Sequence, residues 1–154
     1  MQLGVCLQLA AALHIPPVFI PSADFVLSWT HSIEKQRWEE HYRVEYDADQ
    51  KQPVLKALKT RIRGSAAGME PPEQSYWEQG WYVYQPLAPT PQTLPLMRSE
   101  FTPDYEWCDA SGCLPLSAYM PRDGGVTLLS PCITAIEHTQ SRRQEPRQKN
   151  DKHL

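Results

Sequence analysis

The stretch Asp24-Phe25-Val26-Leu27-Ser28-Trp29-Thr30 decides the fold class of this chain. Its odd-numbered positions are large and apolar, and this alternation is typical of a strand with one buried face. A second segment repeats the pattern, with charged residues between the apolar positions Tyr42, Val44 and Tyr46. A third strand is predicted over Val54 to Arg63, with one face formed by Leu58, Thr60 and Ile62 and the other by Lys59, Arg61 and Arg63.

The rest of the domain continues in short segments of the same kind. Fifteen Pro against seven Gly argue against long helices and for strands joined by rigid turns. Pro95 favours an edge position for its strand, because proline cannot donate a hydrogen bond to a sheet. Further strands are predicted over Trp81 to Tyr84, Thr93 to Ser99, Asp104 to Cys108, Cys113 to Tyr119 and Val126 to Ser130. The predicted fold class is therefore all-β, a small antiparallel sandwich or barrel-like domain of about eight strands.

The chain divides into an apolar segment over residues 1–21, one β-rich domain over residues 24–136 and a disordered polar tail over residues 139–154. The apolar segment has three interpretations: a degenerate secretion signal, a first strand of the domain, or a signal anchor. It is too short and too broken by proline to form a stable membrane span. Gly64 to Gly80 is a long irregular loop of the kind that often carries function. The net charge of −3, without clustered Lys and Arg, argues against nucleic-acid binding.

Two cysteines stand at either end of a four-residue turn, at Cys108 and Cys113. Directly opposed residues of a hairpin lie close enough for a disulfide, which also implies an oxidising compartment. Half of a metal site and two free thiols are the alternatives, although zinc needs three or four ligands. If the segment that contains Cys6 were removed as a signal, Cys132 would remain as a buried free thiol.

A polar group follows the first strand, in Trp29-Thr30-His31-Ser32-Ile33-Glu34-Lys35, with Glu39 and Glu40 shortly after. Three roles compete for it: turn capping with ion pairing, ligand binding, and acid–base catalysis. Neighbouring residues of a strand point to opposite faces, so His31 and Ser32 are not expected to act as base and nucleophile. We therefore predict no catalytic residue. A hydrolase that uses His31 with Glu34 or Glu39 is the enzymatic alternative.

A second polar group begins at Arg61 and Arg63 and runs through a small-residue loop to Gly68. The two guanidinium groups and the backbone N–H groups of the loop could hold an anion. The spacing is not that of a nucleotide-binding P-loop. The competing interpretation is that the glycines Gly64 and Gly68 simply permit a tight reversal.

These motifs together resemble a bacterial family known as domain of unknown function 1850. The matching features are Trp29 to Lys35 with its following acids, the strand and loop from Arg61 to Pro72, Arg98-Ser99, and the Cys108/Cys113 hairpin. The resemblance covers residues 24 to 118. It implies an exported, periplasmic protein, often found beside the membrane components of tripartite TRAP transporters that use a TAXI-type solute-binding protein. It implies no activity.

The leading hypothesis is an exported, non-enzymatic module that binds a TRAP transporter component or its solute. We expect a polar cluster at one end of the sandwich, closed over by the loop of residues 64–80. The candidate ligand-binding residues are His31, Ser32, Glu34, Glu39, Arg61, Arg63, Gly68 and Arg98. No metal and no cofactor are predicted. A purely structural interaction domain without a pocket is a further alternative.

Overall fold

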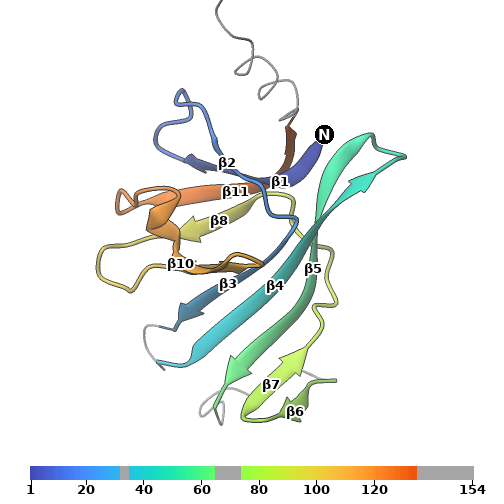
Figure 1. The fold of residues 1–154 in the computed structure, drawn as a ribbon. Helices are drawn as coiled ribbons and strands as arrows, with labels where there is room; N and C mark the ends of the chain where they lie inside the picture. Colours follow the sequence, from blue (N-terminus) through green and yellow to red (C-terminus); the bar gives the residue numbers. More distant parts are fainter. Residues whose placement is uncertain (32–34, 65–73, 135–154) are drawn as a thin grey trace, which may run out of the picture.

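Two antiparallel sheets make up the computed structural model, which describes residues 1–31, 35–64 and 74–134. The smaller sheet has the strand order β2-β1-β11-β8, and the larger has the order β10-β9-β3-β4-β5-β7-β6. The predicted fold class is confirmed, since nearly all regular structure is antiparallel β. In Figure 1 the smaller sheet packs beside the middle of the larger one, and β4 and β5 continue beyond it toward β7 and β6.

The four-stranded sheet joins the two ends of the described chain. Its strands are β1 (Gln2–Leu9), β2 (Val18–Ile20), β8 (Leu94–Met97) and β11 (Val126–Thr134). Strand β8, which contains Pro95, lies at the edge of this sheet as predicted.

The seven-stranded sheet contains the segments from which the fold class was predicted. Its strands are β3 (Asp24–Thr30), β4 (Arg37–Asp47), β5 (Gln52–Arg63), β6 (Tyr76–Glu78), β7 (Trp81–Tyr84), β9 (Glu106–Asp109) and β10 (Gly112–Pro115). Strand β6 was not predicted, because the stretch of residues 64–80 was expected to be irregular throughout. A second correction follows β10, where Leu116–Ala118 forms a short 3₁₀ helix and ends the strand that was expected to continue to Tyr119.

The N-terminal segment forms β1 and β2 in this structure, which is the first-strand interpretation among the three. Strand β1 pairs with β11 along its whole length, and Val5 and Leu7 are fully buried. Gly4 permits β2 to approach closely, because a Cβ there would overlap the carbonyl oxygen of Ile20.

A disulfide between Cys6 and Cys132 crosses the β1–β11 pair, with a Cα–Cα distance of 5.8 Å. Cys132 is therefore not a free thiol in the chain that retains its N-terminal segment. Its partner lies 126 residues away in the chain, and no local pattern in the sequence indicated the pairing. The predicted tail of residues 139–154 lies outside the described residues.

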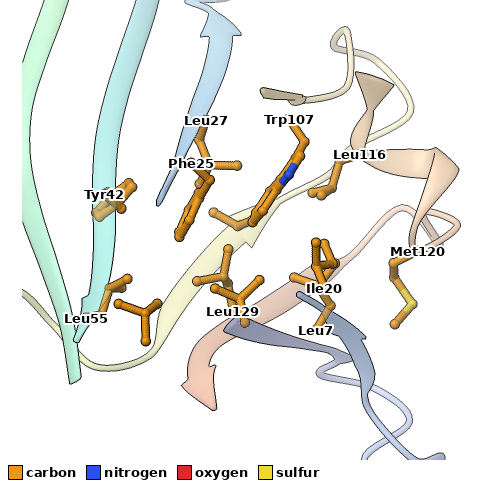
Figure 2. Close-up of a cluster of buried hydrophobic side chains, with 13 residues drawn as sticks. Leu7, Ile20, Phe25, Leu27, Tyr42, Leu55, Trp107, Leu116, Met120 and Leu129 are labelled. Carbon is orange, nitrogen blue, oxygen red and sulfur yellow. The ribbon is translucent and has the colours of Figure 1, made fainter. Parts of the chain in front are cut away.

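The core fills the space between the two sheets, as Figure 2 shows for Leu7 and Leu129 of one sheet and Phe25 and Tyr42 of the other. Trp107 is its largest member and is fully buried. Its ring stacks on Phe25 at a centroid distance of 4.3 Å. Its indole N–H donates to Asp109 at 2.9 Å, so that the one polar atom of this buried side chain has a partner.

We call the core-facing side of the seven-stranded sheet the inner face and the opposite side the outer face. Alternation along β3, β4 and β5 assigns each side chain to one of the two. A register shift between His41 and Tyr42 leaves Leu58 of β5 without an opposed residue. Alternation along β4 is uninterrupted, and the extra residue in β5 lets Leu55, before the bulge, and Thr60 and Ile62, after it, all face the core.

Candidate binding site on the outer face

The sheet itself brings acidic and basic side chains together on its outer face. Ser28 of β3, Glu39 of β4 and Arg61 of β5 are opposed in one row of the register. His41 lies opposite Lys59 in an adjacent row of the same face. Period-two alternation on three neighbouring strands is enough to produce this arrangement.

Glu39 is the centre of the cluster. Arg61 Nη1 donates to its Oε2 at 3.1 Å. His41 Nε2 lies 3.4 Å from the same oxygen, close enough for an ion pair but without hydrogen-bond geometry. Burial lowers the pKa of His41 below 6.5 and the charge of Lys59 lowers it further, against the opposing effect of Glu39. The imidazole is therefore mainly neutral at pH 7.

The guanidinium groups of Arg61 and Arg63 both lie over the ring of Trp81 in β7. The Arg61 guanidinium carbon lies 4.3 Å from a ring centroid of Trp81, and that of Arg63 lies 5.6 Å from it. Both distances are within cation–π range. Arg61 also contacts Glu39, whereas Arg63 is exposed and has no carboxylate within ion-pair distance among the described residues. Within the described part of the chain, Arg63 thus has N–H donors without a carboxylate partner next to the ring of Trp81.

A cavity of about 330 Å³ opens beside this group. A second ion pair lies at its wall, where Arg37 Nη2 contacts Glu106 Oε1 at 3.1 Å. The polar and aromatic residues that line the cavity are Ser28, Arg37, Glu39, Arg63, Trp81 and Glu106. Two guanidinium groups and two carboxylates therefore border a space suited to a small charged ligand.

A larger hollow of about 790 Å³ lies on the same face. The two share Val26 and Cys108 in their walls. The larger hollow extends over His41 and Lys59 toward Tyr76 at the beginning of β6. The outer face therefore offers a continuous binding surface and not one isolated pocket.

The predicted site residues separate into four groups. Glu39, Arg61 and Arg63 are brought together on the outer face. His31 follows β3, with its ring 6.3 Å from that of Trp29 and its backbone N–H bonded to the carbonyl of Gln36. The candidates Ser32, Glu34 and Gly68 lie outside the described residues.

Arg98 occupies a different place from the other predicted candidates. It follows β8 of the four-stranded sheet, and its side chain is completely buried. It donates two parallel hydrogen bonds to Asp104, at 3.0 and 2.8 Å, and a third to Thr127. These hydrogen bonds engage the Arg98 guanidinium group inside the protein, away from the outer face.

Several residues of this site were not singled out from the sequence, namely Arg37, His41, Lys59, Trp81 and Glu106. Alternation had already placed Lys59 on the same face as Arg61 and Arg63, and it could also have found Arg37 and His41. Arg37, Glu39 and His41 have the same parity along β4, as do Lys59, Arg61 and Arg63 along β5. Trp81 and Glu106 are placed here by long-range strand pairing, for which the sequence carries no local pattern.

The second disulfide lies on the same face. Cys108 and Cys113 are directly opposed in the β9–β10 hairpin and are bonded to each other, as predicted. Among the described residues, these two sulfurs and the Glu106 carboxylate form a group compact enough to hold a metal ion. Both sulfurs are engaged in the disulfide, so no thiolate is available as a ligand in this state.

The fold and this surface define a disulfide-linked, two-sheet β domain with a charged outer face. The chain belongs to the family described as Domain of unknown function (DUF1850), whose sequence model matches residues 25–116, more than half of its length. No curated protein and no solved structure was found to match the chain. Among the residues that the structure describes, no helix has the length and hydropathy needed to cross a membrane.

Proposed function

We propose that this protein is an exported, non-enzymatic binding module that holds a small carboxylate-bearing ligand on its outer face. One observation carries the proposal: two arginines lie over the ring of Trp81, and among the residues that the structure describes only one of them contacts a carboxylate. A ligand carboxylate would supply the missing negative charge at Arg63.

The chemistry of the site supports an anionic group. Guanidinium groups bind carboxylates through two parallel N–H donors, and stacking on a ring orients the fork. Like charges close together repel, so an anion between Arg61 and Arg63 is favoured by both. The nearby carboxylates of Glu39 and Glu106 favour a ligand that carries an amino group as well as the carboxylate.

The contacts of the nearby polar groups support binding without catalysis. The Ser28 hydroxyl donates to the carbonyl of Trp38 at 3.2 Å. His41 faces Glu39, and a nucleophile would need its hydroxyl within hydrogen-bond reach of the imidazole. The hydrolase that uses His31 with Glu34 or Glu39 remains the enzymatic alternative.

Two disulfides support export to an oxidising compartment such as the periplasm. The resemblance to proteins found beside TAXI-type TRAP transporters suggests the partner, a membrane or solute-binding component of such a system. The carboxylate ligand would then be a solute of that transporter, and the module would deliver it or report its presence.

A screen of the full chain by thermal shift tests the proposal, with dicarboxylates such as succinate and glutarate and with acidic amino acids. We expect stabilisation by at least one of these compounds and a weaker response from Arg63→Gln. Lys56→Gln is the matched control, because Lys56 is exposed on the same face but paired with Glu45 at 2.7 Å and lines neither hollow. Absence of any shift, together with failure to retain a permease or solute-binding protein in a pull-down, would refute it.

A further inference from the structure

Lys59 is a second cation on the outer face of β5, four residues before Arg63. Its register partner is His41, whose pKa is lowered by burial and by the charge of Lys59 itself. Among the described residues, no carboxylate lies within ion-pair distance of the Lys59 ammonium. Lys59 is half-buried, and a charge in that setting is normally paired, because removing it from water without compensation is costly.

The larger hollow of about 790 Å³ has Lys59 in its wall. Its other charged side chains already have partners. Asp24 pairs with Arg43 at 2.7 Å, and Asp109 accepts a hydrogen bond from the Trp107 indole N–H at 2.9 Å. Within the described part of the chain, Lys59 is therefore the charge of this hollow that a ligand can match.

Apolar side chains make up much of the remaining wall of this hollow. They belong to Val26, Leu58, Val83 and Leu87. Leu87 is 81% exposed, so part of this apolar surface is open to a ligand. Burial of methylene groups against such a surface is favourable. A ligand with a carbon chain would fit this wall better than a compact ion.

Lys59 also borders a smaller cavity of about 250 Å³, whose wall includes Glu40. The Glu40 carboxylate is engaged by other donors, namely the Trp29 indole N–H at 3.4 Å and the Tyr42 hydroxyl. Alternation along β4 places Glu40 on the inner face, whereas Lys59 has the parity of the outer-face arginines along β5. Glu40 is therefore not the counter-charge of Lys59.

The two cations without a carboxylate partner, Lys59 and Arg63, lie along one strand with a neutral stretch between them. Four residues of a strand span about 13 Å. Arg61 lies between the two and is already bound to Glu39, so this middle stretch carries no net charge. The hollow that contains Lys59 and the cavity that contains Arg63 share wall residues, so one ligand could extend through both.

We propose that the ligand of the outer face is an extended dicarboxylate, bound by Arg63 at one end and by Lys59 at the other. The inference rests on the proposed function, which assigns the first carboxylate to Arg63. Because both cationic side chains can reach toward the middle, the carboxylates would be about 9–11 Å apart, the length of a diacid of eight to ten carbons at about 1.25 Å per bond. An amino group beside the first carboxylate would leave this spacing unchanged.

Calorimetric titration of the full chain with diacids from succinate to sebacate tests the inference. We expect sebacate to bind at least about tenfold more tightly than succinate, because only the longer diacid reaches both cations. Monomethyl sebacate keeps the length and the carbon chain but has one carboxylate, and it should bind at least about tenfold more weakly than sebacate. This comparison separates charge pairing from burial of the chain, and it uses the natural protein.

Two results of this titration would overturn the inference and leave the proposed function standing: sebacate that binds no more tightly than succinate, or no more tightly than its half-ester. In both cases short diacids would still bind, and Arg63→Gln would still weaken them. If none of the diacids or acidic amino acids binds, the proposed function and the inference fail together.

Variants of β5 assign the second carboxylate to its cation. Lys59→Gln should remove the advantage of sebacate over its half-ester and change succinate binding by less than about twofold, since charges this far apart are largely screened. Lys59→Arg restores a cation and should restore the advantage. Lys56→Gln is the matched control, because Lys56 is paired with Glu45 at 2.7 Å and lines neither hollow. If Lys59→Gln keeps the full advantage of sebacate, the inference is wrong.

Discussion

The region of the four-stranded sheet and the outer face of the seven-stranded sheet each contain a disulfide and an arginine–carboxylate pair, Arg98–Asp104 in the first and Arg61–Glu39 in the second, in opposite settings. In the first region Arg98 has no exposed side-chain surface and Asp104 is 11% exposed. In the second, Arg61 and Glu39 are 24% and 22% exposed. The Arg98 pair is closed by two parallel hydrogen bonds, whereas the Arg61 pair has one.

This difference distinguishes a structural charge from a charge available to a ligand. The guanidinium of Arg98 directs its hydrogen bonds to Asp104 and Thr127 inside the protein. Arg61 shares Glu39 with His41, and the neighbouring Arg63 beside Trp81 has no carboxylate partner among the described residues. The two regions should therefore respond in opposite ways to substitution: stability should change in one and ligand affinity in the other.

The largest expected difference in the free energy of unfolding is between removal of one disulfide and removal of the other. Removing the Cys6–Cys132 bond by double alanine substitution should cost about 5 kcal/mol in the free energy of unfolding, because it closes a loop of more than 100 residues. Removing the Cys108–Cys113 bond should cost only about 2 kcal/mol by the same chain-entropy argument. Urea denaturation measures both, and equal losses would contradict the assignment of stability to the four-stranded sheet.

The next largest expected difference in the free energy of unfolding is between substitutions of the carboxylates of Asp104 and Glu39. Asp104→Asn should lower the free energy of unfolding by about 3–5 kcal/mol, because it leaves the Arg98 guanidinium buried without its counter-charge. Glu39→Gln should change it by no more than about 1 kcal/mol, as for other partly exposed ion pairs. If the second substitution proved as destabilising as the first, the outer-face cluster would be structural and the comparison would fail.

For ligand affinity, substitution on the outer face should have a large effect although its effect on stability is small. Arg63→Gln should weaken carboxylate binding about tenfold or more, because hydrogen bonds between charged groups contribute about 1.5–3 kcal/mol. The midpoint of its thermal unfolding should stay within a degree or two of the natural value, since Arg63 is exposed. Calorimetric titration and thermal unfolding of one preparation give both quantities. A variant that binds normally would show that Arg63 is not part of the site.

The smallest effects concern pH. Burial raises the pKa of Asp104, but the hydrogen bonds and charge of Arg98 outweigh this and hold it below 3.8. As the pH falls, the Asp104 carboxylate is therefore protonated first in the unfolded chain. The stabilisation from ionised Asp104 is complete above pH 4 and is lost as the pH falls through the folded-state pKa. Asp104→Asn should remove this acid-sensitive component from the unfolding curve.

His41 has its own pH window. Burial holds its folded-state pKa below 6.5, so the unfolded chain is protonated first as the pH falls through 6.5. Stability should therefore decrease from pH 7 toward that lower folded-state pKa, and His41→Gln should remove the decrease. Unfolding free energies measured across this range check the sign; a stability that rises on mild acidification would contradict it.

Much of the seven-stranded sheet could be predicted from period-two patterns. Alternation along β5 correctly separated Arg61 and Arg63 from the buried Thr60 and Ile62. The sequence could not distinguish Arg61 from Arg98, because both lie at strand ends and only tertiary packing buries one of them. Asp104 and Thr127, which bury Arg98, come from segments that the fold alone brings together.

The N-terminal strands show the other limit of sequence reasoning. Apolar residues in β1 have the composition of a secretion signal, and their partner strand β11 is at the far end of the described chain. Pairing between such distant segments leaves no local pattern, and the same reason explains the unexpected Cys6–Cys132 bond. The site residues Trp81 and Glu106 were missed on the same ground.

A single NMR titration compares the two regions in one spectrum. The side-chain Nε–Hε resonances of Arg61, Arg63 and Arg98, with the indole N–H of Trp81, would be followed while the dicarboxylate or acidic amino acid found by thermal shift is added. The account predicts that the resonances of Arg61, Arg63 and Trp81 move together and saturate while that of Arg98 stays in place. Saturable binding that leaves the three outer-face resonances unchanged would contradict it.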